Sequence, residues 1–329
     1  MSHELKNKLS DNLKSLWSPL ASFDAIKARA KLYQNIRKFF DMKQVIEVET
    51  PLLGFTSVTS PYISSLEISD NKQKYYLQTS PEYAMKRFLC AYSKNSIFQI
   101  CKSFRKEEIG RQHHIEFSML EWYRLDFSIF DLMNETQELL KLVLNKDLNI
   151  KKYTYQNIFL KYLSIDPLEI SYDYLLARFK ELIKLQNNNL YQQLTFDDML
   201  QQLFCKYIEP KLKSVYIYNF PKSQAALAKI NQEDSRVANR FELYLNGIEL
   251  ANGYDELLDY SSYKNRFDLE NQERQQQNLP TINLDYLLLD ALKESKGLPS
   301  CSGVALGLDR LLMFLLNEDN IEKVISFRQ

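Results

Sequence analysis

Two stretches of this 329-residue chain place an arginine beside acidic or glycine residues, a combination suited to holding a triphosphate. The first reads Phe-Arg-Lys-Glu at 104–107 and leads to Glu-Phe-Ser-Met-Leu-Glu-Trp-Tyr at 116–123. The second reads Gly-Val-Ala-Leu-Gly-Leu-Asp-Arg at 303–310. The planar guanidinium groups of Arg105 and Arg310 can bind phosphate oxygens in pairs, which a lysine ammonium cannot do. Because a lone arginine more often makes a routine surface salt bridge, the prediction of a phosphate site depends on the two stretches together.

With residues 28–53, these stretches resemble motifs 1, 2 and 3 of the class II aminoacyl-tRNA synthetases, in that family's order. The surrounding residues look like the lysine-specific branch, and most like the elongation factor P lysine ligases, which are paralogues of lysyl-tRNA synthetase. The resemblance implies an α+β catalytic fold with an antiparallel sheet flanked by helices. It also implies use of ATP and Mg²⁺, and a homodimer with motif 1 at its interface.

The resemblance implies roles for particular residues at the nucleotide. Arg105 would bridge the α-phosphate and the amino-acid carboxylate, and Arg310 would hold the γ-phosphate. Glu242 and Glu249 would bind magnesium through hard carboxylate oxygens, although two glutamates on a hairpin are usually solvated edge charges. The implied ATP contacts are Arg105, Lys106, Glu107, His114, Glu249, Leu250, Gly307 and Arg310, with Gly303 allowing close backbone approach. His114 stands where lysyl-tRNA synthetases commonly carry asparagine, and it can still make one hydrogen bond.

A second set of residues is implied for the amino acid, and it suits a dibasic substrate such as lysine or (R)-β-lysine. Glu121, Tyr123 and Glu256 would receive the side-chain ammonium. Glu82 would face the other amine, and Asn252 would help to hold the carboxylate. The implied substrate contacts are Ser80, Pro81, Glu82, Glu121, Tyr123, Asn252, Glu256 and Ala305. Ala305 replaces the middle glycine of motif 3, either as a selector of the β-isomer or as tolerated drift that lowers chain entropy.

Several local patterns predict the elements that carry these residues. Apolar residues at helical spacing predict a helix over 28–40, and 45–51 reads as a strand ended by proline. A strand over 75–78 is followed by Ser80 as a helix N-cap and Pro81 at the first helical position. Capping alone would also explain Glu82 in the first turn. Asn-Gly at 246–247 predicts a hairpin that carries Glu242 and Glu249 on its two arms.

Composition limits the alternatives. Lysine plus arginine equal aspartate plus glutamate at 42 each, so no global positive field favours a polynucleotide. The cysteines at 90, 101, 205 and 301 form no C-x-x-C pair, which predicts free thiols rather than structural zinc. The absence of an apolar leader or a spanning apolar run predicts a soluble, cytoplasmic protein.

The expected organisation is one catalytic domain over 1–329 with a helical insertion at about 148–214. Motif 1 begins too near the start of the chain for an anticodon-binding OB-fold to precede it, so tRNA is an unlikely partner.

Three functions remain open on this basis. The first is ATP-dependent activation of a lysine-type amino acid, with (R)-β-lysine as the expected substrate, and its transfer to a lysine side chain of elongation factor P. The second is a minimal lysyl-tRNA synthetase or an asparagine-synthetase-like enzyme that uses another acceptor. The third is a catalytically inactive regulator or amino-acid sensor derived from a synthetase. Glu121 and Glu256 disfavour an aspartate substrate, and the phosphate and metal residues disfavour an inactive relative.

Overall fold

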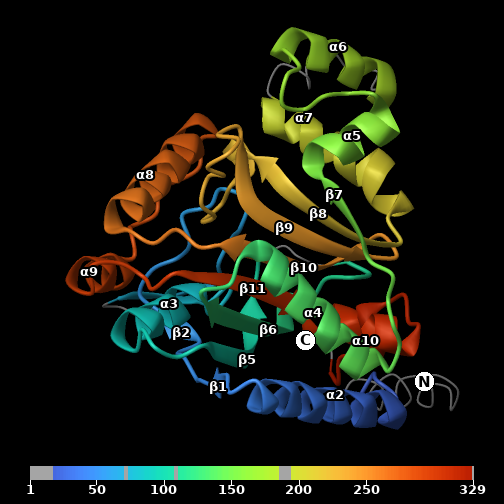
Figure 1. Ribbon diagram of the computed structural model, residues 1–329, viewed down its shortest axis with the longest axis vertical. Helices are drawn as coiled ribbons and strands as arrows, with labels where there is room; N and C mark the ends of the chain where they lie inside the picture. Colours follow the sequence, from blue (N-terminus) through green and yellow to red (C-terminus); the bar gives the residue numbers. More distant parts are fainter. Residues whose placement is uncertain (1–17, 70–72, 107–109, 185–193, 328–329) are drawn as a thin grey trace, which may run out of the picture.

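The computed structural model describes residues 18–69, 73–106, 110–184 and 194–327. Its strands form a sheet of eight strands and a smaller sheet of three (Figure 1). The large sheet has the order β1 (Ile46–Glu47), β5 (Ile97–Phe104), β6 (Glu116–Leu125), β11 (Cys301–Gly307), β10 (Ile248–Asp255), β9 (Val237–Leu245), β8 (Ser214–Pro221) and β7 (Lys151–Thr154). The small sheet has the order β2 (Leu53–Gly54), β4 (Lys74–Leu77) and β3 (Glu67–Ser69).

The centre of the large sheet is antiparallel, as predicted, from β5 through to β8. The outermost pairs, β1 with β5 and β7 with β8, are parallel. Successive side chains of a strand point to opposite faces, so each strand supplies both the core and the site. In β6, Leu120 and Trp122 are buried in the main hydrophobic core, whereas Glu121 and Tyr123 line a cavity on the other face.

Three helices contribute to the main hydrophobic core: α2 (Phe23–Met42), α4 (Ile129–Leu144) and α10 (Leu308–Leu316). Helix α2 begins after Ser22, whose hydroxyl accepts a hydrogen bond from the N–H of Ala25 at 3.1 Å. The apolar stripe that predicted this helix is buried, including Ile36 and Phe40. The helix is therefore confirmed, and it extends beyond the predicted range at both ends.

A second group of helices lies beside the large sheet. It consists of α3 (Glu82–Ala91), α8 (Tyr260–Gln276) and α9 (Tyr286–Glu294), which share a separate cluster of buried side chains. In Figure 1 these helices lie to the left of the large sheet. This arrangement brings α3 and α8 close to the ends of the strands that carry the site.

The segment expected to be a helical insertion forms a lobe with a hydrophobic cluster of its own. It contains α5 (Tyr155–Leu163), α6 (Tyr172–Ile183), α7 (Phe196–Leu203), a π-helical turn (Phe204–Ile208) and a 3-10 turn (Glu209–Lys211). Figure 1 places this lobe above the large sheet, and the same segment also contributes the edge strand β7. Two further 3-10 turns occupy Lys222–Gln224 and Ile321–Lys323.

Two local predictions are wrong in detail. Only Ile46–Glu47 of the predicted 45–51 strand is in the sheet, because β1 is an edge strand that pairs over just those two residues. Ser80 does not cap the following helix, which begins at Glu82 with Pro81 as its N-cap and no side-chain cap hydrogen bond. The carbonyl of Pro81 accepts the first helical hydrogen bond, from the N–H of Met85 at 2.9 Å. The helix therefore starts one residue later than predicted.

The predicted hairpin is confirmed. Asn246 and Gly247 have φ angles of 50° and 74°, the left-handed conformations that a tight two-residue turn requires. The turn joins β9 to β10, so that Glu242 and Glu249 lie on neighbouring strands. No helix in the described part of the chain is long and apolar enough to cross a membrane.

Candidate active site

One cavity, of about 730 Å³, brings together residues from both arginine stretches, from the hairpin and from the start of α3. The predicted site residues that line it are Ser80, Glu82, Arg105, His114, Glu121, Tyr123, Glu242, Glu249, Leu250, Asn252, Glu256, Gly303, Ala305, Gly307 and Arg310. Pro81 and Lys106 do not line it, and Glu107 lies outside the described residues. The fold thus gathers nearly all of the predicted residues around one space.

The floor of the cavity is a single row of residues across four strands. Glu121 on β6 pairs with Ala305 on β11, which pairs with Asn252 on β10, which pairs with Glu242 on β9. Residues directly opposite each other in a sheet project to the same face. The register therefore places a predicted amine-binding residue at one end of the row and a predicted metal ligand at the other.

The carboxylates at the amine end share a cation supplied by the protein itself. The Nζ atom of Lys86 lies 2.6 Å from Oε1 of Glu82 and 2.7 Å from Oε2 of Glu256. The side chain of Lys86 is fully buried. Burial acts to lower the pKa of Lys86, but the charges of Glu256 and Glu82 hold it above its ordinary value. Lys86 is therefore an ammonium ion within the predicted substrate pocket.

Lys86 was not predicted from the sequence, although a signal for it was available. Lys86 follows Glu82 by four residues in a predicted helix, and residues at that spacing lie on the same face. Its contact with Glu256 has no counterpart in the local sequence, since Glu256 follows a strand far along the chain.

Glu121 and Glu256 are carboxylates removed from water. Burial, followed by the nearby charge of Glu82, raises the pKa of Glu121 to about 8. The hydroxyl of Tyr123 donates a hydrogen bond to Glu121 at 2.7 Å. Burial likewise raises the pKa of Glu256 to about 7, although Lys86 acts in the opposite direction. Such a pocket favours a cationic ligand, because a positive charge stabilises the ionised form of both groups.

Glycine is required at Gly303, on the strand beside this pocket. A Cβ atom there would lie 2.4 Å from the ring of Tyr123 and 2.6 Å from Oε1 of Glu256. These separations are too short for any real side chain, so residue 303 must lack one for Tyr123 and Glu256 to keep their places.

The carboxylates of the hairpin face the cavity and also contact cations. Glu242 is buried, and it is paired with the guanidinium of Arg240 through one oxygen while the hydroxyl of Tyr244 donates to the other at 2.5 Å. Burial raises the pKa of Glu242 to about 7, with Arg240 opposing the rise and Glu249 adding to it. A divalent cation would relieve the repulsion between Glu242 and Glu249, and both are hard oxygen ligands.

The residues therefore fit Mg²⁺ held by two carboxylates. The described residues contain no group of three or more histidine, cysteine or acidic side chains arranged for a metal. Magnesium is usually held by one or two carboxylates together with phosphates and water, so two carboxylates are a sufficient set of protein ligands for it.

Arg310 and Arg105 reach the cavity from different elements. Nη1 of Arg310, on α10, donates to the backbone carbonyl of Glu249 at 2.7 Å. Nη2 of Arg310 lies 2.5 Å from Nε2 of His113, a neighbour of the predicted His114 that the sequence analysis did not select. Arg105 follows β5 directly, and its guanidinium lies 5.2 Å from the centre of the Phe117 ring.

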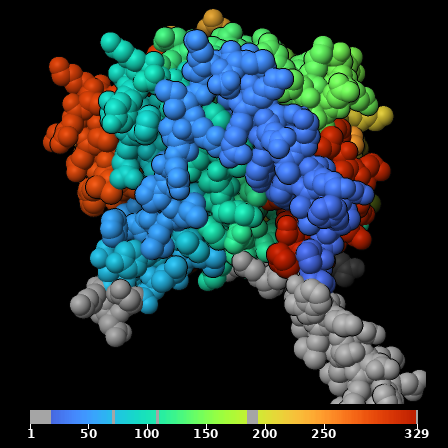
Figure 2. Space-filling view, turned by 90° about the horizontal axis from the view of Figure 1, so that it is seen from below, coloured from blue at the N-terminus to red at the C-terminus, as the bar shows by residue number. Residues whose placement is uncertain are grey.

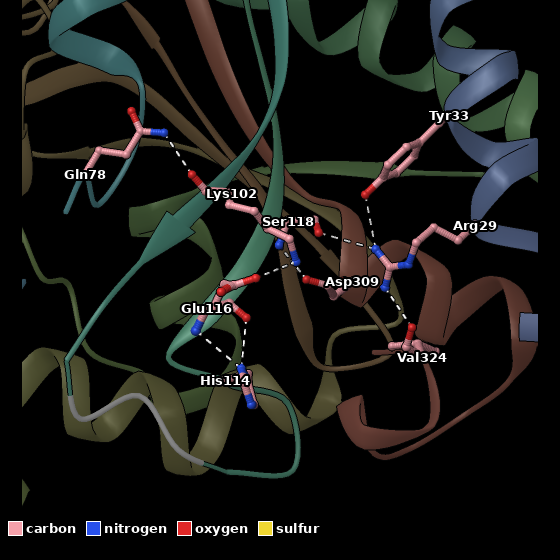
Figure 3. Close-up of polar contacts among 9 residues, drawn as sticks. All are labelled: Arg29, Tyr33, Gln78, Lys102, His114, Glu116, Ser118, Asp309 and Val324. Carbon is pink, nitrogen blue, oxygen red and sulfur yellow. Dashed lines mark hydrogen bonds and ion pairs between the residues drawn. The ribbon is translucent and has the colours of Figure 1, made fainter. Parts of the chain in front are cut away.

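Behind Arg310, the buried carboxylate of Asp309 connects three elements (Figure 3). It lies 2.5 Å from Nη2 of Arg29 on α2, and it accepts a hydrogen bond from the N–H of Ser118 on β6 at 2.6 Å. Arg29 also donates to the carbonyl of Val324 at 2.8 Å. Because Asp309 precedes Arg310, these contacts fix the start of the helix that carries the arginine.

Figure 3 also shows the turn that carries His114. Its Nδ1 atom lies 2.9 Å from the backbone oxygen of Glu116, whose side chain pairs with Lys102 at 3.2 Å. Gln78 donates to the carbonyl of Lys102 at 2.8 Å. The ring of His114 therefore lines the cavity while it contacts its own turn.

Comparison with known proteins agrees with this geometry. Residues 16–329 match the family model described as tRNA synthetases class II (D, K and N). The chain belongs to this class II synthetase family.

Its relatives include three proteins named elongation factor P--(R)-beta-lysine ligase. The protein from Buchnera aphidicola subsp. Schizaphis graminum is 42% identical, with 96% of this chain and 98% of the relative aligned. The protein from Avibacterium paragallinarum is 44% identical over 94% of this chain and 97% of its own. The protein from Pseudoalteromonas translucida is 44% identical over 95% and 98%.

Membership of the class II synthetases confirms the family, the α+β fold class and the ligase activity predicted from the sequence. The roles predicted for individual residues stay predictions. The cavity adds His113, Arg240 and Tyr254 to the predicted set, and Lys86 contacts two of the lining carboxylates, Glu82 and Glu256, without lining the cavity itself. Each of the three lining residues stands close in the chain to a predicted one: His113 precedes His114, Arg240 lies on the hairpin arm that carries Glu242, and Tyr254 lies between Asn252 and Glu256.

Proposed function

We propose that this class II synthetase-like enzyme activates a lysine-type amino acid, (R)-β-lysine in preference, and transfers it to a lysine side chain of elongation factor P. The observation that carries the proposal is the cavity itself, which is lined both by buried carboxylates and by the arginines predicted to bind phosphate. The names of the relatives, aligned over nearly their whole length, support the choice of amino acid and acceptor.

The proposed reaction has two steps. The amino-acid carboxylate attacks the α-phosphorus of ATP, an oxygen–phosphorus bond forms, and pyrophosphate leaves. The neutral ε-amine of the acceptor lysine then attacks the activated carbonyl, an amide forms, AMP leaves, and the amine gives up a proton. Arg105 and Arg310 would stabilise the negative charge that develops on the phosphates and hold the reactants in line. Magnesium bound by Glu242 and Glu249 would supply further positive charge at the phosphates.

The charge around the cavity favours a protein lysine over tRNA as the acceptor. Besides the substrate carboxylates, the cavity is lined by Asp197 and Asp198 on α7 and by Glu270 and Glu273 on α8. Carboxylates attract a cationic lysine side chain and repel the phosphates of a nucleic acid. This acidic lining would weaken the binding of tRNA to an enzyme that charges it.

Other activities are supported less well. An aspartate-activating enzyme needs a cation for the substrate side chain, whereas this pocket presents Glu82, Glu121 and Glu256. A minimal lysyl-tRNA synthetase would share the activation step and differ only in its acceptor. A regulator without activity has no use for Arg105 and Arg310 in one cavity.

We also propose that the enzyme is a homodimer and acts in the cytoplasm, where elongation factor P functions. Figure 2 shows the face covered by the blue segment that contains α2 and β1. Exposed apolar side chains are frequent in this segment: Phe23, Met42, Ile46, Leu52, Leu53, Phe55 and Ile68. Apolar side chains concentrated in one exposed segment are typical of an interface.

The acceptor decides between the activities. The enzyme is incubated with ATP, Mg²⁺ and labelled α-lysine or β-lysine, together with either elongation factor P or bulk tRNA. We expect label on elongation factor P, with β-lysine as the better donor. Label on tRNA alone would replace the proposal with the synthetase alternative, and absence of any amino-acid-dependent ATP–pyrophosphate exchange would leave the regulator.

A further inference from the structure

At the amine end of the cavity, a fixed cation lies behind the lining carboxylates. Any bound substrate must share these carboxylates with it. Lys86 is on α3, and it contacts Glu82 on the same helix and Glu256 just beyond β10. The side chains of Lys86 and Glu256 are 0% and 1% exposed, whereas that of Glu82 is 20% exposed. Lys86 therefore lies behind the carboxylates, and Glu82 is the more open of the two toward the cavity.

Lys86 contacts one oxygen of each carboxylate, which leaves the second oxygen of each available for other partners. Lys86 holds Oε1 of Glu82 and Oε2 of Glu256 at ion-pair distances. The contact with Glu256 is an ion pair in which both side chains are buried. Oε1 of Glu256 lies on the side of Gly303 and Tyr123, where both residues line the cavity.

The surroundings of Lys86 restrict its movement. Its Nζ atom lies 5.2 Å from the centre of the Tyr263 ring on α8, a favourable position for a cation over an aromatic face. Tyr263 is itself fully buried. A buried ammonium between two carboxylates and a ring has no alternative partner of equal strength, so α3, α8 and the end of β10 are held to one another through it.

We infer that Lys86 is a specificity-determining positioning residue, which sets the spacing between the carboxylates of Glu82 and Glu256 and thereby selects where the substrate carries its amines. The inference rests on the proposed function, because it concerns the amino acid that is activated.

Spacing matters because α-lysine and β-lysine contain the same atoms. They differ in whether the amine is attached one or two carbons from the carboxylate, a shift of about 1.5 Å, the length of one carbon–carbon bond. Two carboxylates free to move could follow either amine. Two carboxylates bound to one nitrogen have a fixed separation, so only one isomer can match both of them and Arg105 at once.

Three variants test the inference in the full-length enzyme. Lys86→Arg keeps the charge but binds the two carboxylates through different nitrogens, which separates them. Lys86→Met removes the charge and keeps the approximate length. Lys229→Met is the matched control, since Lys229 pairs at 2.7 Å with Asp255, the neighbour of Glu256, and does not line the cavity. ATP–pyrophosphate exchange is measured with each isomer, giving kcat/KM for both and KM for ATP.

We expect Lys86→Arg and Lys86→Met to change the ratio of kcat/KM between the isomers by roughly tenfold or more, the scale of discrimination for a small displacement in a pocket. The KM for ATP should stay within about twofold, because nucleotide contacts are unaffected. Lys229→Met should leave the ratio as in the wild type. A folded Lys86 variant with the wild-type ratio overturns the inference, because a purely structural lysine would lower both activities together.

If neither Lys86 variant folds, the wild-type enzyme decides. With ¹⁵N-labelled lysine, a slowly exchanging Nζ resonance of the buried ammonium is expected without substrate, and it should persist and shift when β-lysine binds. Disappearance of that resonance on binding, or no shift at all, would show that Lys86 does not hold the carboxylates in the complex. Wild-type enzyme without lysine-dependent exchange refutes the proposed function itself, whereas wild-type exchange with unchanged variant ratios refutes only the role of Lys86.

Discussion

At the scale of single residues, Arg105 and Arg310 line one cavity from opposite parts of the chain. Arg105→Ala or Arg310→Ala is expected to reduce amino-acid-dependent ATP–pyrophosphate exchange by about 10²-fold or more, because each loses contacts that strengthen as charge develops on the phosphates. Arg236→Ala is the control, since Arg236 makes exposed pairs with Asp234 and Glu169 away from the cavity. Near-wild-type exchange in a folded variant would remove the assignment of adenylation.

Glu256 is the residue at which charge in the amine pocket can be changed directly. Glu256→Gln is expected to weaken use of lysine-type substrates by about 2–5 kcal/mol, since a desolvated ammonium loses a charged partner. ATP binding should change little. The comparison is the KM for amino acid against the KM for ATP, and equal loss of both would assign Glu256 to the nucleotide or to the fold.

The same pocket predicts a pH dependence. The pKa of Glu121 in the empty enzyme is raised to about 8 by burial and by the charge of Glu82. Below that value the carboxyl group carries a proton that an incoming ammonium must displace, so affinity for the amino acid should fall as the pH falls from about 8 to 6. Calorimetry in buffers of different ionisation enthalpy would detect proton release on binding at pH 7. Binding that is independent of pH over this range would contradict the prediction.

Ala305 lies between Glu121 and Asn252 on the cavity floor. Its methyl group would displace the substrate backbone from the position that α-lysine needs, a difference of roughly 1–3 kcal/mol. Ala305→Gly is therefore expected to raise activation of α-lysine relative to β-lysine, measured as exchange with both isomers. If the ratio does not change, the alanine reflects tolerated drift, and selectivity depends on other residues such as Lys86.

At the scale of elements, the carboxylate of Asp309 joins α10 to α2 through a buried ion pair and to β6 through a hydrogen bond. Asp309 contacts Arg29 on α2 and the backbone of β6, and it is almost fully buried. Asp309→Ala is expected to destabilise the protein by about 3–5 kcal/mol, because it leaves the guanidinium of Arg29 in a largely buried place without its partner. Urea unfolding measures the loss.

Asp319→Ala is the matched control for that experiment. The ion pair between Arg111 and Asp319 is exposed, with side chains 71% and 78% accessible. Loss of this pair should therefore lower the free energy of unfolding by less than about 1 kcal/mol. Similar destabilisation in both variants would show that the contacts of Asp309 do not hold α10 to the rest of the fold.

At the scale of the whole molecule, the cavity over the floor of the central sheet is lined by side chains from the insertion lobe and from the second helical group. Because α7 comes from the lobe and α8 from the other group, the acidic lining of the cavity combines parts of the chain that have separate hydrophobic cores.

The apolar segment of α2 to β3 also belongs to this scale. Sedimentation should find a dimer, and the double variant Ile46→Glu/Leu53→Glu should shift it toward monomer, because burying two carboxylates in an apolar interface is costly. Tyr174→Glu, at an exposed aromatic residue of the insertion lobe, is the control and should leave the dimer intact. A monomeric wild type would contradict the prediction.

The sequence determined the features that repeat locally or depend on a few neighbouring residues. The Asn-Gly pair specified the hairpin, and helical spacing specified α2. Each of these follows from backbone geometry within one or two elements, which is why it could be inferred before the fold was known.

Only the tertiary structure decided which charges meet. Glu256 contacts Lys86, Asp309 contacts Arg29, and Arg310 contacts His113, across separations that no local pattern encodes. The register of four strands then placed Glu121 and Glu242 in one row. The strength of a buried ion pair depends on the distance between its charges and on the exclusion of water, and both are set by packing rather than by position in the chain.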